Sequence, residues 1–354
     1  MITDLKIYTA KKASENNPRN SEASIIELKD GSLLIAWQCH QKSAHGSDDT
    51  APGVISLANS VDNGATWQND RIVAKMKDGC VNCYSPSLFR LKDGGICLIF
   101  KRYTHLVYYE KILANVYKIV SYDEGKTWSE EEILFKNSEV HPMNHTVKRL
   151  KNGELLMPVF YSEGGWCAPD DHDIVYVLKS TDEFKTWTES NRITLPMRGA
   201  SEPCISEGAD GTLYMVLRNQ LGSVFKSISV DGGLTWSKPQ TTGLVAPESC
   251  PAIVAVPNSN AQIVIWNNSE YNPTWATHYG KRTPLTMAIS FDGLKTFTNF
   301  VDIETDPNRA FTNPSFTITS NGLFVLNYWT CEYSKEGRMG GLIDLKIATF
   351  KVEL

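Results

Sequence analysis

Short apolar runs that follow a turn signal recur along the whole chain. In most of them the turn is marked by Asp-Gly or Asn-Gly, the two-residue signal that joins two strands in a β-hairpin. Long amphipathic helical periodicity is nearly absent. The pattern therefore predicts an all-β protein built from six similar hairpins. The six runs occupy residues 27–37, 90–100, 149–157, 208–215, 257–266 and 319–326.

A second repeat lies out of phase with the first. Its first copy, residues 60–67, reads Ser-Val-Asp-Asn-Gly-Ala-Thr-Trp, and four further copies keep most of these positions. The Asp is suited to accept backbone N–H groups within a turn, the Gly supplies a positive φ, and the Trp packs over the next strand. We interpret the repeat as structural. The five copies begin at Ser60, Ser121, Ser180, Ser229 and Ser290.

Two hairpins in each unit of roughly 60 residues give four strands per unit. Six such units predict a six-bladed β-propeller with four-stranded antiparallel blades, in which radial closure removes long exposed edges. Residues 3–8 and 344–354 also have strand-like patterns, and we expect them to share the blade that closes the ring. A single domain, 1–354, is expected.

Composition excludes several classes of protein. Lys and Arg total 35 against 40 for Asp and Glu, a net charge of −5 that predicts neither nucleic-acid nor membrane binding. No apolar run approaches the roughly 20 residues that span a bilayer. Residues 1–20 lack the apolar segment and cleavage site of a signal peptide, so a cytoplasmic protein is expected, or a secreted one if a leader has been removed. The oligomeric state is left open.

The eight cysteines do not form the pattern of a disulfide scaffold or a zinc site. Cys80 and Cys83 make a C-x-x-C pair, but a structural zinc needs a second pair at matching spacing. We expect reduced thiols that pack as small hydrophobic groups, with no metal and no cofactor.

The five Ser-x-Asp turns resemble the Asp-boxes, or BNR repeats, of the sialidase (neuraminidase) superfamily, whose members are six-bladed propellers. The resemblance extends over nearly the whole chain. Sialidases hold the substrate carboxylate with three arginines, use a tyrosine nucleophile activated by a glutamate, and use an aspartate as acid/base. The resemblance therefore implies an exo-acting glycosidase.

Five charged residues stand where this resemblance implies site residues. Arg19 precedes the first hairpin strand, and Arg218 and Arg282 stand where the second and third arginines are expected. Asp49 looks like the acid/base aspartate. Glu202, in a Ser-Glu-Pro segment, looks like the glutamate.

The nucleophile departs from the family pattern, because Asn313 stands where the tyrosine is expected. A phenol suits sialic acid, since a carboxylate nucleophile would be repelled by the carboxylate of the substrate. Without the tyrosine, three outcomes are open. Glu202 attacks or activates a water with Asp49 as the acid; another tyrosine, such as Tyr328 or Tyr84, enters the site; or the site binds a sugar acid without cleaving it.

Other residues are candidates at the edge of the site. His145, at the start of a strand, is a candidate for substrate contact, and Trp166, in the insert at 161–173, is available to stack on a sugar. Asp48 is the alternative to Asp49. The acidic residues of the insert are interpreted as surface groups and not as a metal site.

These observations predict a sialidase-like glycoside hydrolase that cleaves a glycosidic bond of an unidentified, acidic sugar. The first alternative is a catalytically silent propeller that binds a sugar acid or a protein through the same face. The second is a lyase on uronate-containing glycans, with His145 or a tyrosine as base. The sugar, the linkage and the stereochemical outcome are left open.

Overall fold

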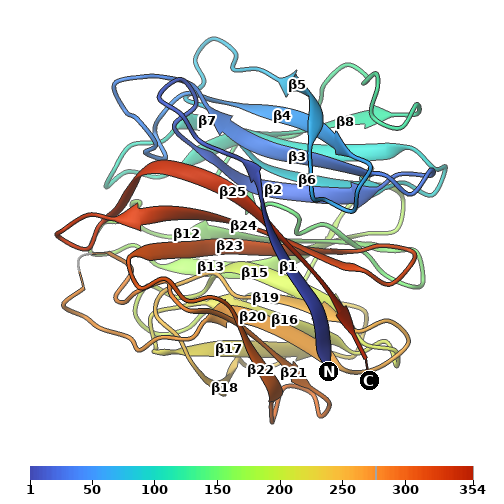
Figure 1. The fold of residues 1–354 in the computed structure, drawn as a ribbon, viewed down its shortest axis with the longest axis vertical. Helices are drawn as coiled ribbons and strands as arrows, with labels where there is room; N and C mark the ends of the chain where they lie inside the picture. Colours follow the sequence, from blue (N-terminus) through green and yellow to red (C-terminus); the bar gives the residue numbers. More distant parts are fainter. Residues whose placement is uncertain (276, 354) are drawn as a thin grey trace.

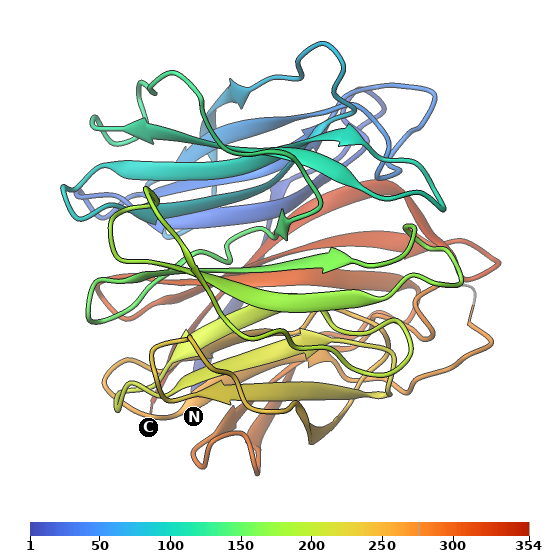
Figure 2. The ribbon, with the colours of Figure 1, turned by 180° about the vertical axis from the view of Figure 1, so that it is seen from behind.

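The computed structural model describes residues 1–275 and 277–353. Within these residues the chain forms strands, turns and connecting loops. The strands pair into six antiparallel sheets, which lie side by side in Figures 1 and 2. The described residues include no helix that is long and apolar enough to cross a membrane. The predicted all-β, six-bladed propeller is confirmed.

Five blades are each built from consecutive strands, and the first strands of neighbouring blades contact one another around the centre. The first blade contains β2 (Asn20–Glu27), β3 (Leu33–His40), β4 (Gly53–Ser60) and β5 (Gln68–Ala74). The second contains β6 (Cys83–Arg90), β7 (Ile96–His105), β8 (Leu113–Ser121) and β9 (Glu132–Ser138). The third contains β10 (His141–Pro142), β11 (Lys148–Arg149), β12 (Leu155–Ser162), β13 (Asp173–Ser180) and β14 (Thr188–Glu189). Its first strand is interrupted, because β10 and β11 both pair with β12.

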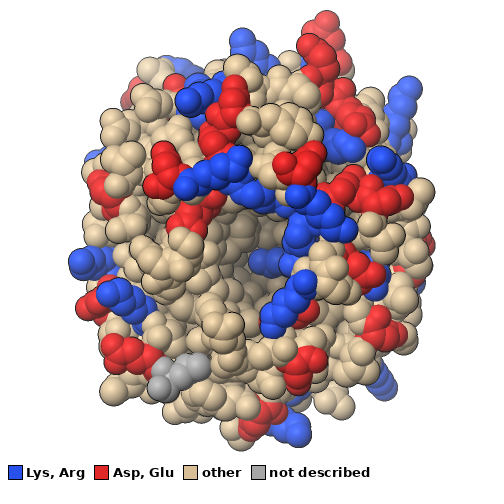
Figure 3. Space-filling model, turned by 90° about the vertical axis from the view of Figure 1, so that its right-hand side faces the viewer, with Lys and Arg blue, Asp and Glu red and all other residues tan. Residues whose placement is uncertain are grey.

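The fourth and fifth blades follow the same plan. The fourth contains β15 (Ser201–Glu207), β16 (Leu213–Arg218), β17 (Ser223–Ser229) and β18 (Gln240–Val245). The fifth contains β19 (Ala252–Ala255), β20 (Gln262–Asn267), β21 (Leu285–Ser290) and β22 (Thr298–Glu304). The molecule is hollowed at the centre of the face shown in Figure 3, where Lys and Arg side chains lie along the upper and right-hand edges of the hollow.

The sixth blade joins the two ends of the chain. It contains β23 (Arg309–Ile318), β24 (Phe324–Tyr333), β25 (Met339–Val352) and, as its outermost strand, β1 (Ile2–Lys11). β1 pairs antiparallel with β25, so the termini lie together in both ribbon views. The expectation that both terminal segments share the closing blade is confirmed, although residue 354 of the second lies outside the described residues.

The core lies between neighbouring blades. Ile263 and Ile265 of the fifth blade, for example, belong to the same buried cluster as Leu326 and Phe350 of the sixth. Each blade therefore buries its apolar face only against its neighbours, which is why the ring must close.

The Ser-x-Asp repeats form the predicted structural turns. In the first, Asp62 accepts hydrogen bonds from the Thr66 amide at 2.9 Å and the Thr66 hydroxyl at 2.7 Å, and Ser60 donates to it at 2.8 Å. The third and fifth copies have Phe184 and Leu294 in place of the glycine, at φ 69° and 63°. Both side chains are buried in the core, which offsets the strain of a left-handed conformation.

Antiparallel geometry separates these turns from the long loops. The Asn-Gly and Asp-Gly hairpins join the first and second strands of a blade, and the Asp-boxes join the third and fourth. Because antiparallel strands alternate in direction, both kinds of turn lie at one end of each blade. The opposite end carries the loops between second and third strands and the links between blades.

The first strands of four blades contain a β-bulge close to that loop end. A bulge re-aims a side chain that regular alternation would place elsewhere. One residue in each bulge has a left-handed backbone, with φ between 47° and 52°. These residues are Glu22, Ser85, Glu202 and Asn313.

Candidate functional site

A cavity of about 900 Å³ lies at the loop end of the propeller, within the size range of small-molecule sites. Its walls come from the first strands of the blades and from the loops between second and third strands. None of the Asp-box residues lines it, in agreement with the structural interpretation of the repeat. The predicted charged residues do line it together: Arg19, Asp49, Glu202, Arg218 and Arg282.

Arg19 lies at the start of β2 and is held by a network of acceptors. Its guanidinium donates to Asp49 Oδ1 at 2.5 Å and to the Tyr84 hydroxyl at 2.7 Å. Tyr84 in turn donates to Asp49 Oδ1 at 2.6 Å. This network holds Tyr84 as a neutral phenol that donates to an aspartate, and burial raises its pKa well above the usual value.

Asp49 faces the cavity, with 46% of its side chain exposed. The surrounding walls tend to raise its pKa, but Arg19 and the Tyr84 hydroxyl outweigh that effect and hold it at about 2. Asp48 is separate, because it contacts the Thr50 amide at 2.9 Å and Tyr108 at the rim. The geometry therefore distinguishes the two aspartates, and only Asp49 contacts an arginine of the predicted set.

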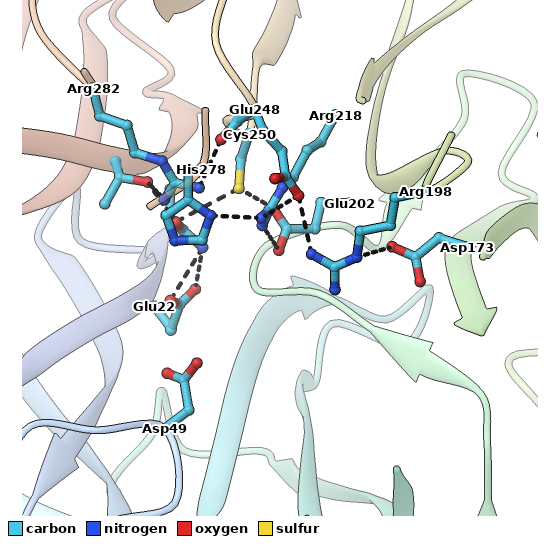
Figure 4. Close-up of polar contacts among 12 residues, drawn as sticks. Glu22, Asp49, Asp173, Arg198, Glu202, Arg218, Glu248, Cys250, His278 and Arg282 are labelled. Atoms are coloured by element: carbon cyan, nitrogen blue, oxygen red, sulfur yellow. Dashed lines mark hydrogen bonds and ion pairs between the residues drawn. The ribbon is translucent and has the colours of Figure 1, made fainter. Parts of the chain in front are cut away.

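Arg218, at the end of β16, is shared between two carboxylates. It donates to Glu202 and to Glu248, each at 2.9 Å, and to His278 Nδ1 at 3.1 Å (Figure 4). Arg198 reaches the same Glu248 at 3.0 Å. Burial tends to raise the pKa of Glu248, but Arg218 is the first of the cationic groups that hold it well below its usual range.

Arg282 differs from Arg19 and Arg218 because it has no carboxylate partner among the described residues. It donates to the Thr312 hydroxyl at 2.7 Å and to the backbone carbonyl of Glu248 at 3.0 Å. Its Nε is buried and has no hydrogen-bond acceptor in the described part of the chain. Burial, and then Arg218, lower its pKa to about 10. A bound anion would neutralise this cation.

Asn313 occupies the position predicted for the nucleophile, and it contacts Glu22. Its side-chain amide donates to Glu22 Oε1 at 3.1 Å and to Oε2 at 2.9 Å. Trp329 Nε1 and Arg19 also donate to Oε1, at 3.2 and 3.4 Å. Burial raises the pKa of Glu22 to about 7.

Glu202 lies on the other side of Asn313, with a thiol between them. Cys250 Sγ contacts Glu202 Oε2, and the same sulfur lies 3.6 Å from Asn313 Oδ1. Four side chains therefore form a continuous series of polar contacts, in which Glu202, Asn313 and Glu22 line the large cavity and Cys250 borders the small one. In order they are Glu202, Cys250, Asn313 and Glu22.

Trp166 lies on the cavity wall, as the sequence predicted. Its ring is stacked on Tyr108, with centroids 4.3 Å apart and an interplanar angle of 10°. Phe160 and Trp329 add further aromatic surface to the wall. An apolar wall with a few converging polar groups is typical of ligand pockets.

Two sequence predictions require correction. His145 does not line the large cavity: it borders a separate cavity of about 30 Å³, and its Nδ1 lies 2.8 Å from the Ser24 hydroxyl. Burial lowers its pKa to about 3, so it is a neutral structural histidine. Tyr328 is fully buried between blades and donates to Glu304 at 2.7 Å, away from the cavity. Neither residue is placed to contact a ligand, and the lyase hypothesis loses His145 as its base.

Sequence reasoning missed several residues of the site: Glu22, Arg198, Glu248, Cys250 and His278. A signal for part of this set is present in the chain. The pairs Ser85-Pro86, Glu202-Pro203, Cys250-Pro251 and Asn313-Pro314 mark the same place in the second, fourth, fifth and sixth blades. Aligning the first strands on these prolines would have placed Cys250 at the position that Glu202 occupies in the neighbouring blade.

Among residues 1–275 and 277–353 no group of three or more His, Cys, Asp or Glu side chains is arranged to hold a metal ion. The acidic groups at the cavity are instead paired with arginines: Arg198, for example, contacts Asp171 at 2.8 Å and Glu248 at 3.0 Å. The site therefore offers hydrogen-bonding and proton-transfer groups to a ligand.

Comparisons with known proteins agree with this architecture. Residues 30–326 match the family model described as a BNR repeat-like domain. No curated protein sequence matches the chain. Among solved structures, a protein of unknown function from Dyadobacter fermentans is similar over 99% of both chains, with 17% identity and a TM-score of 0.76.

Two enzymes are also similar in fold. The NanB sialidase from Streptococcus pneumoniae is 13% identical, with 99% of this chain and 71% of that chain covered and a TM-score of 0.75. The intramolecular trans-sialidase from Ruminococcus gnavus is 15% identical, with 96% of both chains covered and a TM-score of 0.71. At these identities the similarity concerns the fold alone.

Proposed function

The chain belongs to the BNR repeat-like domain family and has a sialidase-like propeller fold, and from this premise we propose that it is a glycoside hydrolase acting on a sugar that carries a carboxylate. The enzymes with similar structures process sialic acid, and this chain departs from the superfamily pattern at Asn313. The proposal therefore concerns the reaction type and the charge of the substrate, and it leaves the sugar open.

The observation that carries the proposal is the convergence of Arg19, Arg218 and Arg282 on one cavity. Planar guanidinium groups bind a carboxylate through paired hydrogen bonds. Arg282 provides the strongest argument, since within residues 1–275 and 277–353 its charge is met only by neutral acceptors and its buried Nε lacks a partner. A substrate carboxylate beside it would supply the missing charge and acceptor.

Asp49 is the proposed proton donor to the leaving group. In the free protein Arg19 and Tyr84 hold it ionised. A substrate carboxylate bound by Arg19 would draw on the same guanidinium and place a second negative charge near Asp49. Both effects raise the pKa of Asp49, so binding of the substrate itself favours the protonated acid.

A catalytically silent sugar-acid-binding propeller is the second candidate. The observation that favours it is the ionised state of Asp49 in the free site, which does not suit a proton donor. Under this alternative the same arginines bind the sugar acid and no bond is broken.

The two candidates are separated by one experiment with two readouts. Aryl glycosides of neutral sugars, uronates and ulosonates are tested for release of the aryl alcohol, and the corresponding free sugars are tested for binding by calorimetry. Cleavage of a carboxylated glycoside supports the hydrolase. Binding of a carboxylated sugar without cleavage supports the silent propeller, and preference for neutral sugars in both readouts contradicts the arginine argument.

A further inference from the structure

Glu22 lies at the bulge of β2, in the position that Glu202 occupies in β15 and Asn313 in β23. Its backbone has a left-handed φ of 47°, and only 3% of the residue is exposed. A non-glycine residue in this conformation is strained, and such strain is concentrated where a side chain must be aimed at a site. The bulge directs the Glu22 carboxyl group into the wall of the cavity.

The contacts of Glu22 are unequal at its two oxygens. Oε1 accepts from Asn313, Trp329 and Arg19. In the described part of the chain, Oε2 accepts only from Asn313, at 2.9 Å. The three donors at Oε1 fix the orientation of the carboxyl group. Oε2 keeps a free lone pair for a water molecule in the cavity.

Glu202 lacks the three donors that fix Oε1 of Glu22, and in the described part of the chain each of its oxygens has one partner. Its Oε1 accepts from Arg218 at 2.9 Å, and its Oε2 contacts the thiol of Cys250. The carboxyl group that stands nearest the missing phenol is also Glu22, because Asn313 donates directly to it and reaches Glu202 only through Cys250.

We propose that Glu22, together with Asn313 as its positioning residue, replaces the absent tyrosine as the catalytic base that activates a water molecule for attack on the anomeric carbon. The inference rests on the proposed glycoside hydrolase function and deepens it. It changes the predicted base from Glu202 to Glu22 and predicts direct hydrolysis by water.

The bonds and protons balance in a single displacement. Glu22 Oε2 takes one proton from the water, and the water oxygen forms a bond to the anomeric carbon. The bond from that carbon to the leaving-group oxygen breaks, and that oxygen receives a proton from Asp49. Both carboxyl groups then return to their starting states by exchange with solvent.

The charges around Glu22 come from several elements. Burial raises the pKa of Glu22, and the negative charges of Glu202 and Asp49 raise it further, whereas the positive charge of Arg19 lowers it. A pKa near 7 suits a base that must release its proton again at neutral pH. The titratable groups that face it are Arg19 on β2, Asp49 in the loop after β3, Tyr84 on β6, Lys101 and Tyr103 on β7, and Glu202 on β15.

The test compares Glu22 with Glu202, which holds the equivalent bulge position and is a matched control. Glu22→Ala and Glu202→Ala are assayed with and without azide on the aryl glycoside that the wild type cleaves best. Glu22→Ala is expected to lose about 10²–10⁴-fold in turnover. Azide needs no base, so it should restore about tenfold or more and give a glycosyl azide, detected by mass spectrometry. Glu202→Ala should give no azide product.

Each other outcome overturns a defined part of the proposal. Azide rescue of Glu202→Ala alone makes Glu202 the base, and rescue of neither variant makes Glu22 structural; both results leave the hydrolase function intact. A folded wild type that cleaves no glycoside overturns the proposed function and this inference with it.

A second variant keeps the test decisive if Glu22→Ala does not fold. Glu22→Gln preserves the shape of the side chain, and unfolding midpoints verify that it folds. On an aryl glycoside with an activated leaving group, which needs little protonation by Asp49, wild-type kcat/KM should rise with pH through about 7 as Glu22 ionises. This acidic limb should be absent in Glu22→Gln. Asp173, buried with a pKa also raised to about 7, is the competing source of the limb. A limb lost in Asp173→Asn and kept in Glu22→Gln overturns the inference.

Discussion

Asn313 and Glu22, 291 residues apart in sequence, are joined by two hydrogen bonds from the Asn313 amide to the Glu22 carboxyl oxygens, at 2.9 and 3.1 Å. The contact spans the junction between the sixth and first blades, since β23 and β2 are their first strands. Where sialidases are expected to have a phenol and a glutamate base, this chain has an amide that holds a carboxyl group. The replacement of the phenol by an amide, and the charges around it, determine which substrates the proposed hydrolase can cleave.

Aryl glycosides of sialic acid should be poor substrates of the unmodified protein, by about 10²-fold or more relative to its best substrate. An amide cannot be ionised to a nucleophile, and a carboxylate beside the anomeric carbon, whether it attacks directly or activates a water, is repelled by a substrate carboxylate on that carbon. Initial rates on matched aryl glycosides measure the difference.

Asn313→Tyr should increase sialic acid hydrolysis, most clearly when combined with Cys250→Ala. The second change removes the thiol that now separates position 313 from Glu202, so that a phenol has room to reach that base. Cys250→Ala alone is the control. Efficient cleavage of sialic acid glycosides by the wild type would contradict this reasoning and direct attention to Tyr84.

Replacing Arg282 should weaken binding of carboxylated sugars selectively. Arg282→Met removes a charge-assisted pair of hydrogen bonds, which corresponds to a loss of about 10–100-fold in affinity. Arg282→Lys keeps the charge and loses the planar fork, so its loss should be smaller. Calorimetry with a sugar acid and its neutral analogue provides the comparison. An equal loss for both ligands would mean that Arg282 only supports the fold of the site.

Asp49→Asn should lower turnover by about 10²–10⁴-fold on glycosides with poor leaving groups. Glycosides with activated aryl groups should be affected much less, because their leaving oxygen needs little protonation. Rates across a series of aryl leaving groups measure this dependence. Equal losses across the series would indicate that Asp49 positions the substrate and does not donate a proton.

Tyr84→Phe should shift to higher pH the fall in kcat that accompanies ionisation of Asp49 in the substrate complex. The Tyr84 hydroxyl donates to Asp49 and stabilises its charged form. Without this hydrogen bond the pKa of Asp49 rises, and the protonated acid persists to higher pH. Tyr103→Phe, which changes a neighbouring buried tyrosine with ring centroids 5.4 Å away, is the control. A larger shift in Tyr103→Phe would contradict the assignment.

The Asp-box turns should make stability depend on acid pH. Hydrogen bonds from the Thr186 amide and hydroxyl lower the pKa of Asp182 from 3.8 to about 2 in the folded protein. A depressed pKa stabilises the fold above the unfolded value and loses that contribution as pH falls through the folded value. Asp182→Asn should therefore be less stable than wild type at neutral pH and fall less steeply from pH 4 to pH 2. Unfolding midpoints across this range test it, and parallel curves would contradict it.

The local chemistry of the chain was sufficient to predict the blades. Asp-Gly and Asn-Gly pairs specify hairpins, and Ser60, Asp62 and Thr66 bond to one another within a few residues. Because these interactions join residues that are close in sequence, a short stretch of sequence is enough to predict them. Repetition then predicted six units, and the strand patterns near both ends predicted how the ring closes.

Which residues line the cavity depends on how the blades close into a ring, and the hydrophobic pattern of a single strand does not contain that information. Tyr328 is next to the cavity residue Trp329 in β24, yet it is buried between blades. His145 lies between β10 and β11 and borders the small separate cavity. Period-two alternation could not predict the bulge that aims Glu22 at the cavity. The sequence by itself determined the blades and gathered the arginines through family resemblance. Only the tertiary structure decided that Glu22 meets Asn313, because a contact between the first and last blades, and the burial that raises the pKa of Glu22 to about 7, exist only once the ring has closed.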